Sequence, residues 1–135
     1  MWPFWRRDDN SPAGLGRKGE RLAVKALKAQ GMKILARNYR CQSAEIDIIA
    51  LENPCERNHH CQTIVFVEVK TRRSARYTDP QSAVDRTKQR KIRLAAGHYL
   101  STHCAQDFST RFDIVAIVMP PNHQPRLEHI VEAFV

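Results

Sequence analysis

Residues 45–51 read EIDIIAL and residues 64–71 read IVFVEVKT, and these two runs decide the fold. Both are rich in Ile and Val and are separated by turn-forming residues, so each predicts a β-strand. Side chains alternate between the two faces of a strand. One face of the first strand then carries Glu45, Asp47, Ile49 and Leu51, and one face of the second carries Ile64, Phe66, Glu68 and Lys70.

The apolar ends of these two runs define how they pair. An antiparallel hairpin that opposes Leu51 to Ile64 also opposes Asp47 to Glu68, because the numbers of paired residues sum to a constant. Residues 52–63 are then the connecting loop. This register predicts that acidic side chains gather at one end of one face of a sheet.

Further elements are expected on both sides of this hairpin. The apolar periodicity predicts a helix over residues 17–30, which Gly31 ends. A second helix is expected over about residues 80–100, with Asp79 as its N-cap and Pro80 in its first turn. Additional strands are expected at residues 33–39, 111–119 and 127–134.

The order helix, three strands, helix, two strands indicates an α/β domain. Its mixed sheet starts with an antiparallel meander of three strands, and a crossover helix makes the third and fourth strands parallel. Residues 1–14 break both periodicities and are expected to be a flexible N-terminal tail, and residues 15–135 a single domain. A chain of 135 residues with 42% hydrophobic residues suffices for one core.

The positive charge is concentrated in one segment. The chain has 22 Lys and Arg against 14 Asp and Glu, a net charge of +8. Residues 70–93 hold nine basic and two acidic residues, so +7 of this charge lies there. Such a field favours phosphates or anionic lipid head groups as partners. No apolar run approaches the roughly 20 residues of a membrane-spanning helix.

Cytoplasmic localisation is expected, because the N-terminal residues show no apolar signal-peptide core. The cysteines are therefore expected to be free thiols. A zinc site formed by Cys55, His59, His60 and Cys61 is an alternative, since these are soft ligands close in sequence. The four residues lack the paired spacing of zinc fingers, and this alternative is the less favoured one.

Acidic and basic side chains at one end of the sheet have a chemical use. Asp47 and Glu68 would repel each other and raise each other's pKa, unless a divalent cation that prefers oxygen ligands lies between them. Mg²⁺ or Mn²⁺ is the natural occupant, and Glu20 could cover this end from the first helix. Lys70 could then orient a water or stabilise a phosphoryl transition state. The competing interpretation is an exposed cross-strand salt bridge, worth about 1 kcal/mol or less.

Several stretches carry a resemblance to a known family: GRKGE at 16–20, RNYR at 37–40, EIDIIA at 45–50, VEVK at 67–70, AV at 83–84 with Lys88, and RFDIV at 111–115. Over about residues 15–134 the chain resembles the YraN-like bacterial family of predicted endonucleases. That family is similar to archaeal Holliday junction resolvases and, more widely, to restriction-endonuclease-like PD-(D/E)xK nucleases. The chain departs from the family at Ala44, where glycine is usual, and in a longer loop at residues 52–63.

The resemblance implies a restriction-endonuclease-like core and a set of site residues. Asp47 and Glu68 would be metal ligands, Glu20 an additional acid at the metal site and Lys70 the catalytic lysine. Symmetric resolvases act as two-fold dimers, so the resemblance is also compatible with a homodimer.

The basic residues of the 70–93 segment are expected to contact backbone phosphates without reading base sequence. They form a loop group and a helix group: Arg72, Arg73 and Arg76, followed by Arg86, Lys88, Arg90, Lys91 and Arg93. A solvated helix face is the competing interpretation of the second group. The scarcity of acids among them and the nearness to Lys70 favour nucleic acid.

The hypothesis from sequence is therefore a metal-dependent endonuclease that hydrolyses phosphodiester bonds in DNA and selects branched or junction structures. RNA would offer the same phosphate backbone to these residues. The alternative is a non-catalytic nucleic-acid-binding or assembly module on the same fold.

Overall fold

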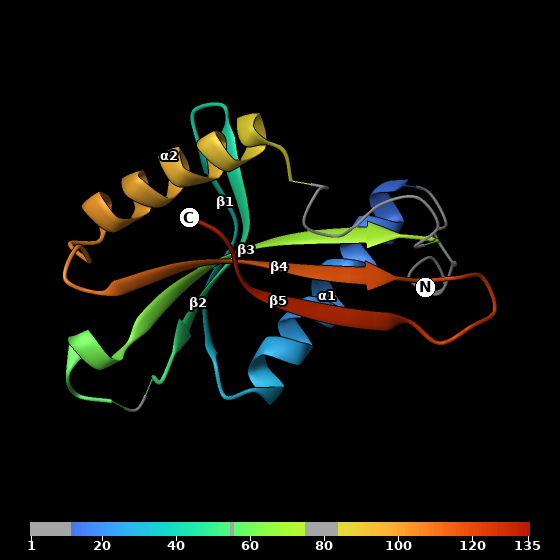
Figure 1. Cartoon of the computed structure of the whole chain (residues 1–135), viewed down its shortest axis with the longest axis horizontal. Helices are drawn as coiled ribbons and strands as arrows, with labels where there is room; N and C mark the ends of the chain where they lie inside the picture. The colour runs from blue at the N-terminus through green and yellow to red at the C-terminus, as the bar shows by residue number, and fades with distance from the viewer. Residues whose placement is uncertain (1–11, 55, 75–83) are drawn as a thin grey trace, which may run out of the picture.

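Five strands form one mixed sheet in the computed structural model, which describes residues 12–54, 56–74 and 84–135 (Figure 1). In spatial order they are β1 (Lys33–Cys41), β2 (Ala44–Glu52), β3 (Thr63–Arg72), β4 (Ser109–Val118) and β5 (Arg126–Phe134). The first three strands are an antiparallel meander, β3 and β4 are parallel, and β5 returns antiparallel to β4. The sheet confirms the predicted α/β architecture.

The pairing of β2 with β3 follows the predicted register. Leu51 lies opposite Ile64, and the ladder runs from Glu52 and Thr63 to Ile48 opposite Val67. The alternation of apolar residues was sufficient to define this register, because a slip of one residue would turn every side chain to the wrong face.

Helix α1 (Pro12–Ala29) covers one face of the sheet. Its Ala23 and Leu27 are fully buried and pack in one cluster with residues of β2, β3 and β4. Gly31 ends the helix as predicted: its φ is +89°, which glycine adopts without strain, and its N–H donates to the carbonyl of Lys28. The helix begins at Pro12, so residues 12–14 belong to it and not to the predicted tail.

Helix α2 (Arg86–Thr102) covers the opposite face and is the crossover between β3 and β4 (Figure 1). Its Ile92, Ala95, Ala96 and Tyr99 are buried, as their spacing predicts. The prediction of its start was wrong, because the N-cap is Asp85 and not Asp79. Asp79 and Pro80 themselves lie outside the described residues. Within the described chain, neither helix is long and apolar enough to span a bilayer.

Strand β2 bends near Asp47, and the predicted face of residues 45–51 is correspondingly wrong in its first half. Ile46 packs in the same cluster as Ile49, on the α2 side, whereas Ile48 packs on the α1 side. Strict alternation would put Ile46 with Ile48. The break lies where the β2–β3 ladder ends, and the β1–β2 hairpin there folds toward α2 (Figure 1). A register shift in β1 after Ile34 accompanies the bend.

Candidate active site between strands β2 and β3

The candidate site lies where β2 and β3 separate. Backbone pairing ends at Ile48 opposite Val67, although β3 continues to Arg72 in its parallel pairing with β4. Beyond this point Asp47 replaces the missing backbone partner, because its Oδ2 accepts a hydrogen bond from the N–H of Val69 at 2.8 Å. The split therefore holds the Asp47 carboxylate next to the stretch of β3 that carries Glu68.

Glu68 is the most enclosed acid of the site, with 4% of its surface exposed. Its Oε1 lies 3.7 Å from Nζ of Lys70 and 3.5 Å from Nζ of Lys88. Its Oε2 is buried and has no hydrogen-bond partner among the described residues. Burial and the nearby Asp47 raise the pKa of Glu68 to about 7, and the two lysines oppose this rise.

Asp47 is half-buried beside Glu68. Burial raises its pKa above the ordinary value, while the Val69 N–H and the charge of Lys88 act in the opposite direction. Two carboxyl groups with raised pKa values in mutual contact are typical of sites that take a cation or move a proton.

Glu20 reaches the site from α1. Burial is the main cause of its raised pKa, and the charge of Asp47 is the next. The Glu20 side chain also hydrogen-bonds Asn38 and faces Arg37, both in β1. Asn38 has a positive φ of 51° within the strand, a conformation that asparagine tolerates better than most residues. Glu20 thus lies near Asp47, Asp47 near Glu68, and Lys70 near Glu68, while the roles expected for these residues stay predictions.

Lys88 also belongs to this site, although the sequence analysis grouped it with the phosphate-binding helix. Asp85 caps α2 and accepts a hydrogen bond from the backbone N–H of Lys88 at 2.8 Å, which fixes the first turn of the helix. The side chain then lies closer to Glu68 than that of Lys70 does. Asn38 and Arg37 were missed as neighbours of Glu20, and the only sequence signal for Asn38 was an asparagine within a strand.

The donor set suits a divalent cation through Asp47 and Glu68. A bound cation would be coordinated by these carboxylate oxygens and would lower their raised pKa values. It would also give a partner to Oε2 of Glu68, which has none among the described residues. The described residues contain no group of three or more His, Cys, Asp or Glu side chains arranged to hold a metal ion. Glu20 therefore lies beside the carboxylate pair without completing a third ligand position in this structure.

The remaining basic residues lie on several surfaces. Arg86, Arg90, Lys91 and Arg93 are exposed on α2, and the guanidinium of Arg93 donates to the carbonyl of Val135 at 2.9 Å. Arg72 is half-buried at the end of β3, and Arg73 is exposed after it. Arg76 lies outside the described residues. Of the described basic residues, Arg72 and Arg73 thus follow Lys70 at the end of β3, and the exposed group on α2 follows Lys88.

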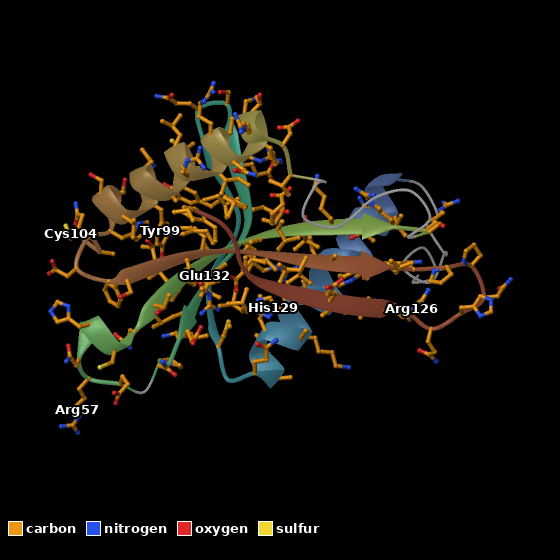
Figure 2. The ribbon with its side chains drawn as sticks, viewed as in Figure 1. Arg57, Tyr99, Cys104, Arg126, His129 and Glu132 are labelled. Carbon is orange, nitrogen blue, oxygen red and sulfur yellow. The ribbon has the colours of Figure 1, made fainter. Side chains whose placement is uncertain are left out.

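Cysteines 41, 61 and 104 are free thiols, and Cys55 lies outside the described residues. The loop between β2 and β3 contains the short helix η2 (His59–Cys61), and the side chain of Gln62 bonds the carbonyl of Asn53. Arg57 lies at the outer end of this loop (Figure 2). His59, His60 and Cys61 therefore belong to a loop at the end of the hairpin opposite the split.

A second polar cluster surrounds the fully buried Asp113 of β4 and is structural. Asp113 accepts hydrogen bonds from Arg111 at 2.9 and 3.0 Å, from Nε2 of His129 at 2.7 Å and from the N–H of Glu132 at 3.1 Å. Burial opposes its ionisation, but these donors outweigh it and lower the pKa of Asp113. Gln30, just after α1, donates to His129. The cluster ties β5, whose His129 and Glu132 are labelled in Figure 2, to β4 and to the end of α1.

Fold and site together define the class: a small α/β protein whose mixed sheet opens between two strands around an acid and lysine cluster. The sequence profile of the group described as "Uncharacterised protein family UPF0102" matches residues 19–117. This chain belongs to the UPF0102 family, whose members are YraN-like.

Relatives of this family cover nearly the whole chain. A UPF0102 protein of Geotalea daltonii is 44% identical over 95% of this chain and 93% of its own length. One of Pelobacter propionicus is 44% identical over 95% of this chain and 86% of its own. One of Nocardia farcinica is 40% identical over 89% of this chain and 88% of its own. The similarity thus includes both helices and the complete split.

Proposed function

We propose that the protein is a metal-dependent endonuclease that hydrolyses phosphodiester bonds in DNA at the split between β2 and β3. The observation that carries this proposal is Glu68, a buried carboxylate. One of its oxygens has no hydrogen-bond partner among the described residues, its other oxygen has two lysines within 4 Å, and Asp47 is a neighbouring acid. A purely structural ion pair would leave no such oxygen without a partner.

Asp47 and Glu68 would hold Mg²⁺ or Mn²⁺ with Glu20 beside them. When bound, such a cation neutralises charge on the phosphate and acidifies a water molecule. Lys70 is one-third exposed, so its ammonium can reach a substrate phosphate or orient the attacking water. Lys88 opposes the rise in the pKa of Glu68 and would contribute a second positive charge beside the phosphate.

The charge distribution supports a nucleic-acid substrate. The exposed basic residues of α2 continue from Lys88, and Arg72 and Arg73 follow Lys70 at the end of β3. Contacts of this kind bind the phosphate backbone and carry no base sequence. Selection of DNA by its structure, at branches or ends, follows from an interface of that type, and the family resemblance to junction resolvases agrees with it.

The experiment is cleavage of branched, flapped, single-stranded and duplex DNA in Mn²⁺. We compare the wild-type protein with Asp47→Ala and Lys70→Ala, and with Asp107→Ala and Lys25→Ala as exposed controls of matched charge. The wild type and both controls should cleave, and each site variant should lose about 100-fold or more in rate. Equal trace cleavage by all five preparations would contradict the proposal.

A non-catalytic nucleic-acid-binding module is the second candidate. It is favoured by one observation, that the described residues hold no preformed set of three acidic or other metal ligands. This candidate expects salt-sensitive DNA binding that survives replacement of Asp47 and Glu68, with no saturable Mn²⁺ binding by calorimetry. Saturable Mn²⁺ binding that is lost in Asp47→Ala would exclude it.

A further inference from the structure

A basic pocket lies near the start of α1, beside the end of β4 and the turn that follows it. It has a volume of about 300 Å³, and Lys18, Arg73 and His123 supply its basic groups. Apolar residues of the turn between β4 and β5 form much of its wall, Met119 and Pro120 among them. None of the described residues that line it is acidic.

The turn that forms this wall is held in place by the backbone. The N–H of Met119 donates to the carbonyl of Arg72 at 2.7 Å, which ties the end of β4 to the end of β3. Pro120, Pro121 and Pro125 restrict the chain, and the N–H of His123 donates to the carbonyl of Pro120. These contacts hold the turn that forms the wall against the end of β3.

The pocket is close to the candidate active site through α1 and β3. Gly19 lies against Thr71 so closely that a Cβ at Gly19 would stand 1.8 Å from the Thr71 hydroxyl oxygen. Lys18 precedes this contact in α1. Arg73 follows Lys70 by three residues, which is roughly 10 Å along an extended chain.

We propose that this pocket binds a nucleotide of an unpaired DNA strand that continues from the scissile phosphate. The proposal rests on the proposed function and deepens it, because it names the substrate feature that the protein selects. Lys18 and Arg73 would bind the phosphate, and the Met119 and proline wall would pack against the base.

An unpaired strand fits this pocket better than a duplex does. Lys70 lies on the α2 side of the sheet with Glu68, whereas Thr71 faces α1, so a strand that reaches Arg73 and Lys18 passes around the end of β3. A single strand bends through such a path easily, but a duplex with a persistence length of about 150 base pairs does not. The exposed basic face of α2 is the surface that suits the duplex part.

The test measures binding by fluorescence anisotropy in EDTA, so that no DNA is cleaved. The probes are a blunt duplex and the same duplex with a short single-stranded overhang. The wild type should bind the overhang probe more tightly. The double variant Lys18→Ala/Arg73→Ala should lose about fivefold or more of its affinity for the overhang probe, and the salt dependence of this binding should weaken by about 0.7 per lost contact.

Two further variants complete the experiment. Lys25→Ala/Lys33→Ala removes the same charge from exposed positions outside the pocket and should keep the preference for the overhang. His123→Ala, in an exposed turn, tests the pocket without touching α1 or β3 and should reduce the preference in the same direction.

The outcomes separate the two proposals. A wild type that binds both probes equally, or a pocket variant that weakens both probes equally, overturns the pocket alone. A wild type that binds neither probe overturns the proposed function together with it.

Discussion

Glu68 shows how a single residue can reveal a site. Its raised pKa means that the folded protein holds this proton more tightly than the unfolded chain does. The carboxyl group thus contributes fully to stability below the unfolded pKa of 4.5, and the contribution is lost as pH rises through about 7. A metal-free protein at pH 8 carries the whole cost of the buried charge.

Glu68→Gln should therefore stabilise the metal-free protein at high pH. In EDTA at pH 8 we expect a gain in the free energy of unfolding on the order of 1–3 kcal/mol, and little change at pH 4. Chemical denaturation at the two pH values measures both. Glu128→Gln, at an exposed position on β5, is the control and should show no such difference. An equal free energy of unfolding for wild type and Glu68→Gln at pH 8 would show that the ionised Glu68 side chain does not destabilise the folded protein.

Asp113 is the opposite case, because its lowered pKa stabilises the ionised form. Asp113→Asn should cost about 3 kcal/mol at neutral pH, since it breaks the buried pairs with Arg111 and His129. The contribution of Asp113 is present above the ordinary carboxyl pKa and is lost as pH falls through the lowered one. The deficit of the variant should accordingly shrink in strong acid, and urea titrations at several pH values measure it. Asp107→Asn is the exposed control, and an equal loss there would contradict a role for the buried cluster.

At the scale of elements, the position of α1 on β3 decides whether Glu20 reaches the split. Gly19 permits this close approach, because any larger side chain meets Thr71. Gly16, one turn earlier in the same helix, has open space at the position of a Cβ. The two glycines therefore form a matched pair for testing the contact.

Gly19→Ala should destabilise the protein by about 1–3 kcal/mol, because α1 must move away from β3. Gly16→Ala should be neutral or stabilise by up to about 1 kcal/mol, since alanine is the better helix former. Thermal unfolding measures both, and Thr71→Ala combined with Gly19→Ala should recover part of the loss. Equal effects of the two alanines would mean that the close contact does not hold α1 in place.

The periodicity of apolar residues predicted most of the helices and strands, but not the contacts between them. The pairing of Leu51 with Ile64 followed from the apolar residues of the hairpin, but the ladder ends at Ile48 opposite Val67, one residue short of the predicted pair of Asp47 and Glu68. The contact of Lys88 with Glu68 could not be predicted from the sequence. It depends on where α2 begins, after its N-cap Asp85, and on how the helix packs on the sheet. The contact of Glu20 with Asn38 depends on the bend of the β1–β2 hairpin. Hydrophobic periodicity in the sequence does not predict such a bend.

At the scale of the whole molecule, +7 of the net charge of +8 lies in residues 70–93, which include Lys70, Lys88 and the exposed arginines of α2. If the exposed face of α2 binds duplex DNA, Arg86→Gln/Arg90→Gln should weaken binding at low salt and reduce the slope of log affinity against log salt by about 0.9 per lost contact. Arg57→Gln/Arg126→Gln is the matched control, because both residues lie away from α2 (Figure 2). Anisotropy titrations over a range of salt measure the slopes. Equal slopes for both variants would mean that binding follows net charge and not this face.

The central claim is that Lys70, beside Asp47 and Glu68, takes part in the hydrolysis of DNA. The most direct measurement is the single-turnover rate constant for cleavage of a flapped DNA in Mn²⁺, with protein in excess, for the wild type and Lys70→Ala. We expect a rate constant about 100-fold or more lower in the variant, with an affinity for DNA that stays within about threefold. Equal rate constants in the two proteins would contradict it.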